Sequence, residues 1–149
     1  MESTECSCEE CKNMCRRRPC WPTPKEVWAL IDKGFGRRLM LDWLGEIQIV
    51  SPAIVGCEGR SAPFVPMGQC TFLTYGGLCE LHSLGLKPFE GRMASCKPCA
   101  SDLLREAAAN SLHRAVAEAW NNSNGGRAVE RWESANAADN THIAEAAMW

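Results

Sequence analysis

The spacing of apolar residues predicts a short helix over residues 24–33. Apolar side chains within residues 27–31 recur on one helical face. Thr23 and Glu26 have the spacing of a capping box, and Pro24 between them suits the first helical position. A glycine follows the segment and favours its termination. The sequence therefore predicts both ends of this helix.

A second, longer helix is predicted from about Ser101 to Trp120. Small or apolar residues recur there at spacings of three and four, namely Leu104, Ala108, Leu112, Ala115 and Ala119. The run 121–126 is rich in asparagine, serine and glycine, so we expect it to end the helix. In the alanine-rich and polar remainder we expect a short helix near 129–134 and a partly flexible end.

Runs of β-type residues predict the strands. Residues 47–50 alternate in the manner of a short strand. Residues 70–75 and 78–82 flank the pair Gly76-Gly77, which is typical of a β-hairpin with a tight turn. The segments between these elements are rich in proline and glycine and are expected to be irregular.

Ten cysteines among 149 residues are the unusual feature of an otherwise ordinary globular composition. The formal net charge of −2 excludes a histone-like basic protein and an acidic disordered tail. The longest apolar run is far shorter than the roughly 20 residues of a membrane span, so we expect no membrane partner. The N-terminus lacks the features of a secretory signal. We therefore expect a cytoplasmic protein whose thiols stay reduced.

Five cysteines lie close together near the N-terminus: Cys6, Cys8, Cys11, Cys15 and Cys20. A Cys-x-x-Cys step lets a tight turn present two sulfurs to one ion, and soft thiolates select zinc, cuprous copper or iron–sulfur clusters. The first 22 residues show no periodicity, so a metal would have to supply their order. In a reducing compartment, metal binding is favoured over a disulfide framework and over unligated thiols.

The other candidate ligands form two further groups. Cys96 and Cys99 stand directly before the long helix, whose dipole favours a thiolate, with a redox Cys-x-x-Cys as the alternative. Cys70, Cys79 and His82 surround the predicted hairpin, and His82 suits a ligand and an ordinary histidine equally well. These groups would supply enough ligands for two four-coordinate sites. The spacing leaves open which ligands share a site. One economical arrangement joins the N-terminal cluster to the hairpin cysteines.

These elements and ligands together predict an α+β fold: a small irregular domain, stabilised by metal, with a Gly-Gly β-hairpin, one short helix and one long helix. We expect a cysteine-rich metal-binding domain over residues 1–120 and a polar, alanine-rich, partly flexible segment over residues 121–149. Most tryptophans are expected in the core, with one or two at an interface: Trp21, Trp28, Trp43, Trp120 and Trp132.

The first cluster reads Cys8-x-x-Cys11-x-x-x-Cys15 and is followed by Arg16. This spacing is similar to the Cys-x-x-Cys-x-x-x-Cys-Cys signature of the YkgJ-type zinc- or iron-chelating proteins, with an arginine in place of the fourth cysteine. The resemblance implies that these thiols chelate zinc or iron.

Segments 68–73 and 77–82 look like the second block of the same family, in which Cys-x-Phe-Leu precedes Gly-x-Cys and an aromatic residue or histidine. The family has a further cysteine after an Arg-Pro pair. Here Lys87-Pro88 lacks that cysteine, and Cys96 and Cys99 would substitute for it. The resemblance covers about residues 6–92. Short blocks around Cys20 and Lys87 also look like small phage or prophage proteins.

The leading hypothesis is a binding protein rather than an enzyme, in which structural zinc stabilises a domain that serves as an interaction module for a protein partner. An iron–sulfur or redox protein is the alternative, because the first cluster resembles part of an iron–sulfur ligand set. No His-Glu-x-x-His motif or nucleophile elbow supports a hydrolase.

A nucleic-acid-binding zinc module is the second alternative. Arg16, Arg17 and Arg18 form a basic run close to Trp21, as in surfaces that bind single strands. The negative net charge and the adjacent pair Glu9-Glu10 favour instead a solvated arginine face that also neutralises thiolates.

Overall fold

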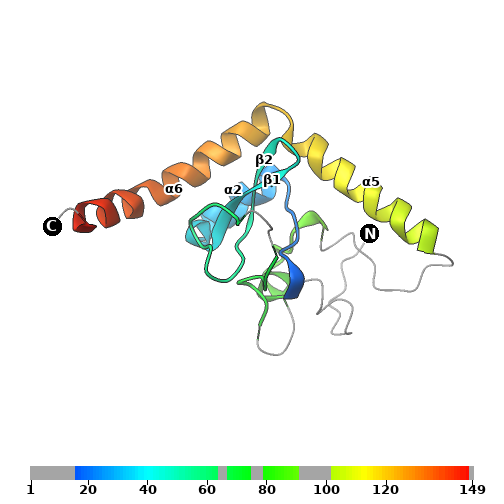
Figure 1. Cartoon of the computed structure of the whole chain (residues 1–149), viewed down its shortest axis with the longest axis horizontal. Helices are drawn as coiled ribbons and strands as arrows, with labels where there is room; N and C mark the ends of the chain where they lie inside the picture. Colours follow the sequence, from blue (N-terminus) through cyan, green and yellow to red (C-terminus); the bar gives the residue numbers. More distant parts are fainter. Residues whose placement is uncertain (1–15, 64–66, 75–78, 91–101, 148–149) are drawn as a thin grey trace.

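The computed structural model describes residues 16–63, 67–74, 79–90 and 102–147, and within the last range it describes the side chains of residues 110–137. The fold is α+β, as the sequence predicts: a two-stranded antiparallel sheet with helices packed on it (Figure 1). The elements in chain order are helix α2 (Pro24–Asp32), 3-10 helix η1 (Gly36–Arg38), strands β1 (Leu39–Leu44) and β2 (Ile47–Pro52), and helices α3 (Glu80–Ser83), α5 (Asp102–Trp120) and α6 (Ser123–Ala147).

Helix α2 begins with the predicted capping box. The Glu26 backbone N–H donates to Thr23 Oγ1 at 3.3 Å, and the Thr23 backbone N–H donates to Glu26 Oε1 at 2.8 Å. The two bonds satisfy backbone donors that a helix start leaves unpaired. Val27, Leu30 and Ile31 face the core, so the predicted apolar face is confirmed.

Strands β1 and β2 form a tight hairpin in which Leu44 pairs with Ile47 and Leu39 pairs with Pro52. Gly45 occupies the two-residue turn with a φ of +64°, a conformation that costs glycine little. The strand predicted over 47–50 is confirmed, and it continues to Pro52.

Neither predicted hairpin strand, 70–75 or 78–82, forms among the described residues, and Cys70 makes only an isolated bridge with Ile54. Leu73 and Cys79 form a single antiparallel bridge, and the chain then turns into the four-residue helix α3. The helical turn buries Leu81 completely and leaves Glu80 on the side where Arg38 binds its carboxylate at 2.7 Å. In a strand, these two adjacent side chains would point to opposite faces of a sheet. Among the described residues, no such sheet forms at this place. Residues 75–78, with the predicted Gly-Gly turn, lie outside the described residues.

The predicted long helix is confirmed as α5, which ends at Trp120. The expectation of only a short helix near 129–134 is wrong, because α6 runs for 25 residues and starts inside the polar run. Asn122 explains this early start: its Oδ1 accepts the backbone N–H groups of Asn124 at 2.9 Å and Gly125 at 3.2 Å. The two helices meet at this junction and diverge from it (Figure 1).

The core lies between α2, the hairpin and the first half of α6. Ala128, Val129 and Trp132 of α6 are buried there at helical spacing. Trp120, the last residue of α5, is buried in the same cluster. Trp120 and Trp132 are buried, as expected for most of the tryptophans, whereas Trp28 and Trp43 are substantially exposed, at 39% and 41%. Within the described part of the chain, no helix is long and apolar enough to cross a membrane.

Candidate functional site

Four of the ten predicted metal ligands fall on described residues: Cys20, Cys70, Cys79 and His82. The other six lie outside the described residues, namely Cys6, Cys8, Cys11, Cys15, Cys96 and Cys99.

Cys20, Cys70 and Cys79 line one small cavity, although they come from three separate segments of the chain. The first two are buried and the third is half-buried. The cavity measures about 10 Å³, which is close to the smallest volume that holds one water molecule. The remaining lining residues are Pro52, Phe72, Leu81, Lys87 and Pro88. This space therefore suits an object of atomic size rather than an organic ligand.

Local backbone pairing brings two of these thiols to the cavity. Cys70 forms an antiparallel bridge with Ile54, just after β2, and Cys79 forms one with Leu73. The bridges are isolated, so the order of this region depends on more than strand pairing.

The described ligands do not by themselves form a coordination shell. Among the described residues, no group of three or more histidine, cysteine, aspartate or glutamate side chains is arranged to hold a metal ion. Three predicted ligands thus line the same cavity, but their side chains are not arranged to coordinate one ion. His82 is half-buried and does not line this cavity.

Glu90 binds the Arg18 side chain before Cys20 and the Trp21 backbone after it. Arg18 donates two hydrogen bonds to its carboxylate, at 2.7 Å and 2.5 Å, and the Trp21 backbone N–H donates a third at 2.9 Å. The Glu90 backbone N–H in turn donates to the Trp21 carbonyl oxygen at 3.1 Å. Because Lys87 and Pro88 precede Glu90 and line the cavity, this clamp holds Cys20 against their segment.

The clamp is a buried ion pair. Glu90 is 2% exposed, and burial alone would lower the pKa of Arg18. The hydrogen bonds and the charge of Glu90 outweigh that effect and raise the pKa of Arg18 above its ordinary value. Removing either partner would leave a poorly solvated charge, so the pair is costly to break.

Two further groups surround the clamp. Asp42 is 5% exposed, and burial raises the pKa of its carboxyl above the ordinary value. The Trp43 backbone N–H, the Trp21 side chain and the charge of Arg18 act in the opposite direction. His113 lies with Nε2 3.3 Å from Glu90, and its ring packs edge-on against Trp21 at 4.9 Å.

Sequence reasoning missed this cluster. Glu90 and Arg18 are separated by 72 positions, and Glu90 stands in a segment without periodicity. His113 has no motif around it. No local pattern marks such partners, because only the folded chain brings them together.

The basic run 16–18 is divided by the fold. Arg18 turns inward to Glu90 and lies 4.3 Å from the centroid of the Trp21 ring, whereas Arg16 and Arg17 are exposed. The run therefore does not present three arginines to one partner.

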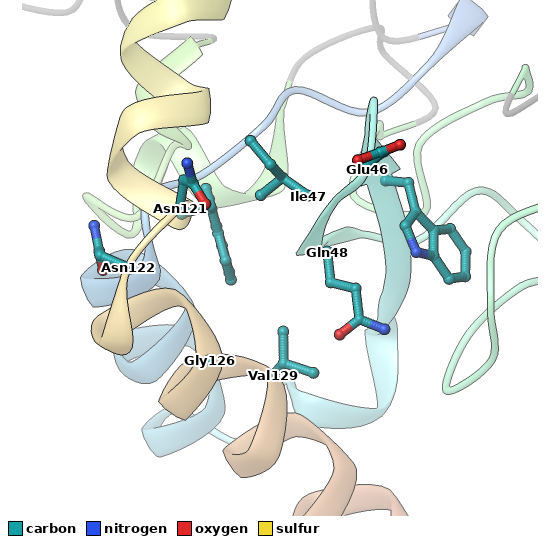
Figure 2. Close-up of a pocket in the computed structure, with 9 residues that line it drawn as sticks. Glu46, Ile47, Gln48, Asn121, Asn122, Gly126 and Val129 are labelled. Carbon is teal, nitrogen blue, oxygen red and sulfur yellow. The ribbon is translucent and has the colours of Figure 1, made fainter.

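A larger cleft of about 650 Å³ lies between the hairpin turn and the junction of α5 with α6 (Figure 2). Figure 2 shows Gln48 and Val129 facing one another across it. Its lining residues are Trp43, Glu46, Ile47, Gln48, Trp120, Asn121, Asn122, Gly126 and Val129. Glu46 is the single ionisable side chain in this set, so these residues do not supply an acid–base pair.

Comparison with protein-family models, with curated proteins and with solved structures found no match for this chain. The resemblance to the YkgJ-type proteins therefore stays a prediction.

Proposed function

We propose that this is a small zinc-binding protein in which cysteine clusters hold structural metal and the stabilised domain serves as an interaction module. The observation that carries the proposal is the cavity lined by Cys20, Cys70 and Cys79. These residues were candidate ligands on sequence grounds alone, and Cys20 is distant in the chain from Cys70 and Cys79.

The physical case rests on what holds this part of the chain together. The segments that carry the thiols have little regular structure beyond isolated bridges and one short helix. A metal ion ligated by thiolates from several segments cross-links them and contributes its binding free energy to folding. Zinc takes four such ligands, so the described thiols would need partners from the remaining candidate cysteines.

The same chemistry sets the working conditions. Thiolates bind metal only while reduced, which agrees with the cytoplasmic location expected from the sequence. Iron would use the same thiols, and a coloured protein would identify it.

Elemental analysis with a visible spectrum tests the proposal. We expect about two zinc ions per colourless chain, because ten cysteines and one histidine suffice for two four-coordinate sites. A chelator should then lower the melting temperature. Metal-free protein that is folded and insensitive to chelator would overturn the proposal.

A matched pair of cysteine variants tests the ligands. Cys79 and Cys57 are both half-buried, but only Cys79 lines the cavity. Cys79→Ser is expected to lower the zinc content and the melting temperature, whereas Cys57→Ser should leave the zinc content unchanged. Circular dichroism shows whether each variant is folded when its zinc is measured. Equal zinc content in the two variants would exclude Cys79 as a ligand.

A further inference from the structure

A second groove lies between the end of α5 and the starts of α2 and α6, and it shares Asn122 with the cleft of Figure 2. Its volume is about 570 Å³. The lining residues are Thr23, Pro24, Lys25, Trp28, Ala119, Asn122, Asn124 and Arg127. Two of these side chains are cationic and none is a carboxylate, in a protein whose net charge is −2.

Trp28 is the aromatic surface of this groove. Its side chain is 39% exposed on α2, and Lys25 precedes it by one helical turn on the same face. Arg127 contributes the second cation from α6. Arg131, one turn further along α6 and outside the lining, lies 5.6 Å from the centroid of the Trp28 ring and 3.8 Å from Asp32. The groove therefore combines an exposed ring with cations from two helices.

The junction residue between the two clefts is held in place. Asn122 Nδ2 donates to the carbonyl oxygens of Glu118 and Ala119, both at 3.0 Å, and its Oδ1 accepts two backbone N–H groups at the start of α6. Figure 2 shows this side chain turned away from Ile47 and Gln48. The wall of the second groove is thus already formed without a ligand.

The two clefts differ in charge and so in the ligand they suit. The cleft of Figure 2 also has an exposed tryptophan, Trp43, but its single ionisable residue is Glu46. An aromatic ring beside cations suits a ligand that carries both a flat ring and a negative charge. The carboxylates of an acidic peptide would pair with Lys25 and Arg127 but would not stack on the Trp28 ring. The volume is within the usual range for small-molecule sites, so the groove admits a short segment of a nucleic-acid single strand.

We propose that this groove binds single-stranded nucleic acid, with one base stacked on Trp28 and the neighbouring phosphates at Lys25 and Arg127. The inference rests on the interaction role of the proposed function and does not depend on the metal. The groove is also a different site from the basic run 16–18, in which Arg18 forms an ion pair with Glu90.

Fluorescence anisotropy of a labelled thymidine oligonucleotide, roughly ten nucleotides long and at low salt, tests the groove on the full chain. Loss of one stacked base should weaken binding about five- to 150-fold in Trp28→Ala, and Trp28→Phe should retain most of it. Trp43→Ala is the matched control, because Trp43 is similarly exposed but lies beside Glu46. Equal loss in the two alanine variants would overturn the proposal.

The cations have their own readout. In Lys25→Gln and in Arg127→Gln, the slope of log affinity against log salt concentration should decrease in magnitude by about 0.7 each. Both side chains are exposed, so these variants should fold normally. An unchanged slope would show that the phosphates bind elsewhere and would overturn the assignment.

Three competing outcomes would also overturn it. Polyglutamate competing as well as the oligonucleotide would identify an acidic protein as the partner. A mononucleotide binding as tightly as the strand would identify a free nucleotide as the ligand. Loss of binding in the double variant Arg16→Gln/Arg17→Gln, but not in Trp28→Ala, would identify the basic run as the site. Melting with and without chelator, measured in parallel, separates failure of this groove from failure of the metal proposal.

Discussion

Two regions of this protein are ordered by different means. The hairpin region, made of α2, β1, β2 and the first half of α6, has continuous backbone hydrogen bonding and buries aliphatic and aromatic side chains. The thiol region, made of residues 16–22, 67–74 and 79–90, has isolated bridges and the short α3. Side-chain hydrogen bonds hold the thiol region: Glu90 ties its first and last segments together. Where the sequence lacks periodicity, hydrogen bonds to charged side chains take the place of regular backbone pairing.

Arg38 joins the two regions. It stands at the end of η1 and donates to the Thr71 carbonyl oxygen at 3.1 Å and to both oxygens of Glu80 at 3.2 and 2.7 Å. Its guanidinium group also lies 4.1 Å from the centroid of the Phe72 ring. One side chain thus attaches α3 and the preceding segment to the hairpin.

The largest expected effect tests the apolar hairpin region. Trp132→Ala should lower the free energy of unfolding by about 3–5 kcal/mol, because it leaves a large cavity beside the hairpin and removes a hydrogen bond to the Leu39 carbonyl oxygen. Glu133→Ala, the exposed neighbouring position, is the control and should have little effect. Denaturant unfolding measures both. Similar small losses would mean that α6 is not part of the core.

The next effect tests the clamp of the thiol region. Glu90→Gln should cost about 3 kcal/mol, because Arg18 would stay largely buried without its countercharge. Glu80→Gln is the control, because the Glu80 carboxylate also forms a bidentate interaction with an arginine but is 41% exposed. If the two variants lost equal stability, burial would not distinguish the two ion pairs. The zinc content of Glu90→Gln would show whether the clamp also supports metal binding.

A smaller effect tests the junction between the helices. A methyl group on Gly125 would overlap the backbone carbonyl of Trp120, so Gly125→Ala should destabilise the protein by about 1–3 kcal/mol. Nothing lies close to the corresponding position on Gly126, where alanine should add up to about 1 kcal/mol by favouring the helix. Thermal melting of the two variants should therefore shift in opposite directions. A shift in the same direction would mean that the close contact with Trp120 is not the reason for a glycine at position 125.

The smallest effect is a dependence on pH. The hydrogen bond from Arg38 lowers the pKa of Glu80 below its ordinary value of 4.5, so the folded state favours its ionised form. This contribution to stability is present above that value and is lost as the pH falls through the lowered pKa. Melting curves of the wild type and Glu80→Gln should differ slightly at neutral pH and converge in acid. A difference that grew in acid would contradict this origin.

The elements with a repeating pattern could be predicted from the sequence. The capping box and apolar face set α2, and the spacing of small residues set α5, because helices depend on neighbours three and four positions away. The strand predicted over 78–82 failed because Leu81 is buried by α3 and Glu80 pairs with Arg38, which is 42 positions distant. The length of α6 was underestimated because burial of Ala128, Val129 and Trp132 outweighs a polar local composition.

The candidate site divides in the same way. The residue types and their spacing suffice to predict thiolate chemistry, because soft ligands are recognised by identity alone. Which thiols share a cavity, and which acid faces Arg18, depends on segments that meet only after folding. The sequence by itself determined the α+β class and both ends of α2, whereas the thiolate site stays a prediction. The tertiary structure decided how Cys20, Cys70 and Cys79 are brought together, because long-range contacts leave no periodic trace in a single chain.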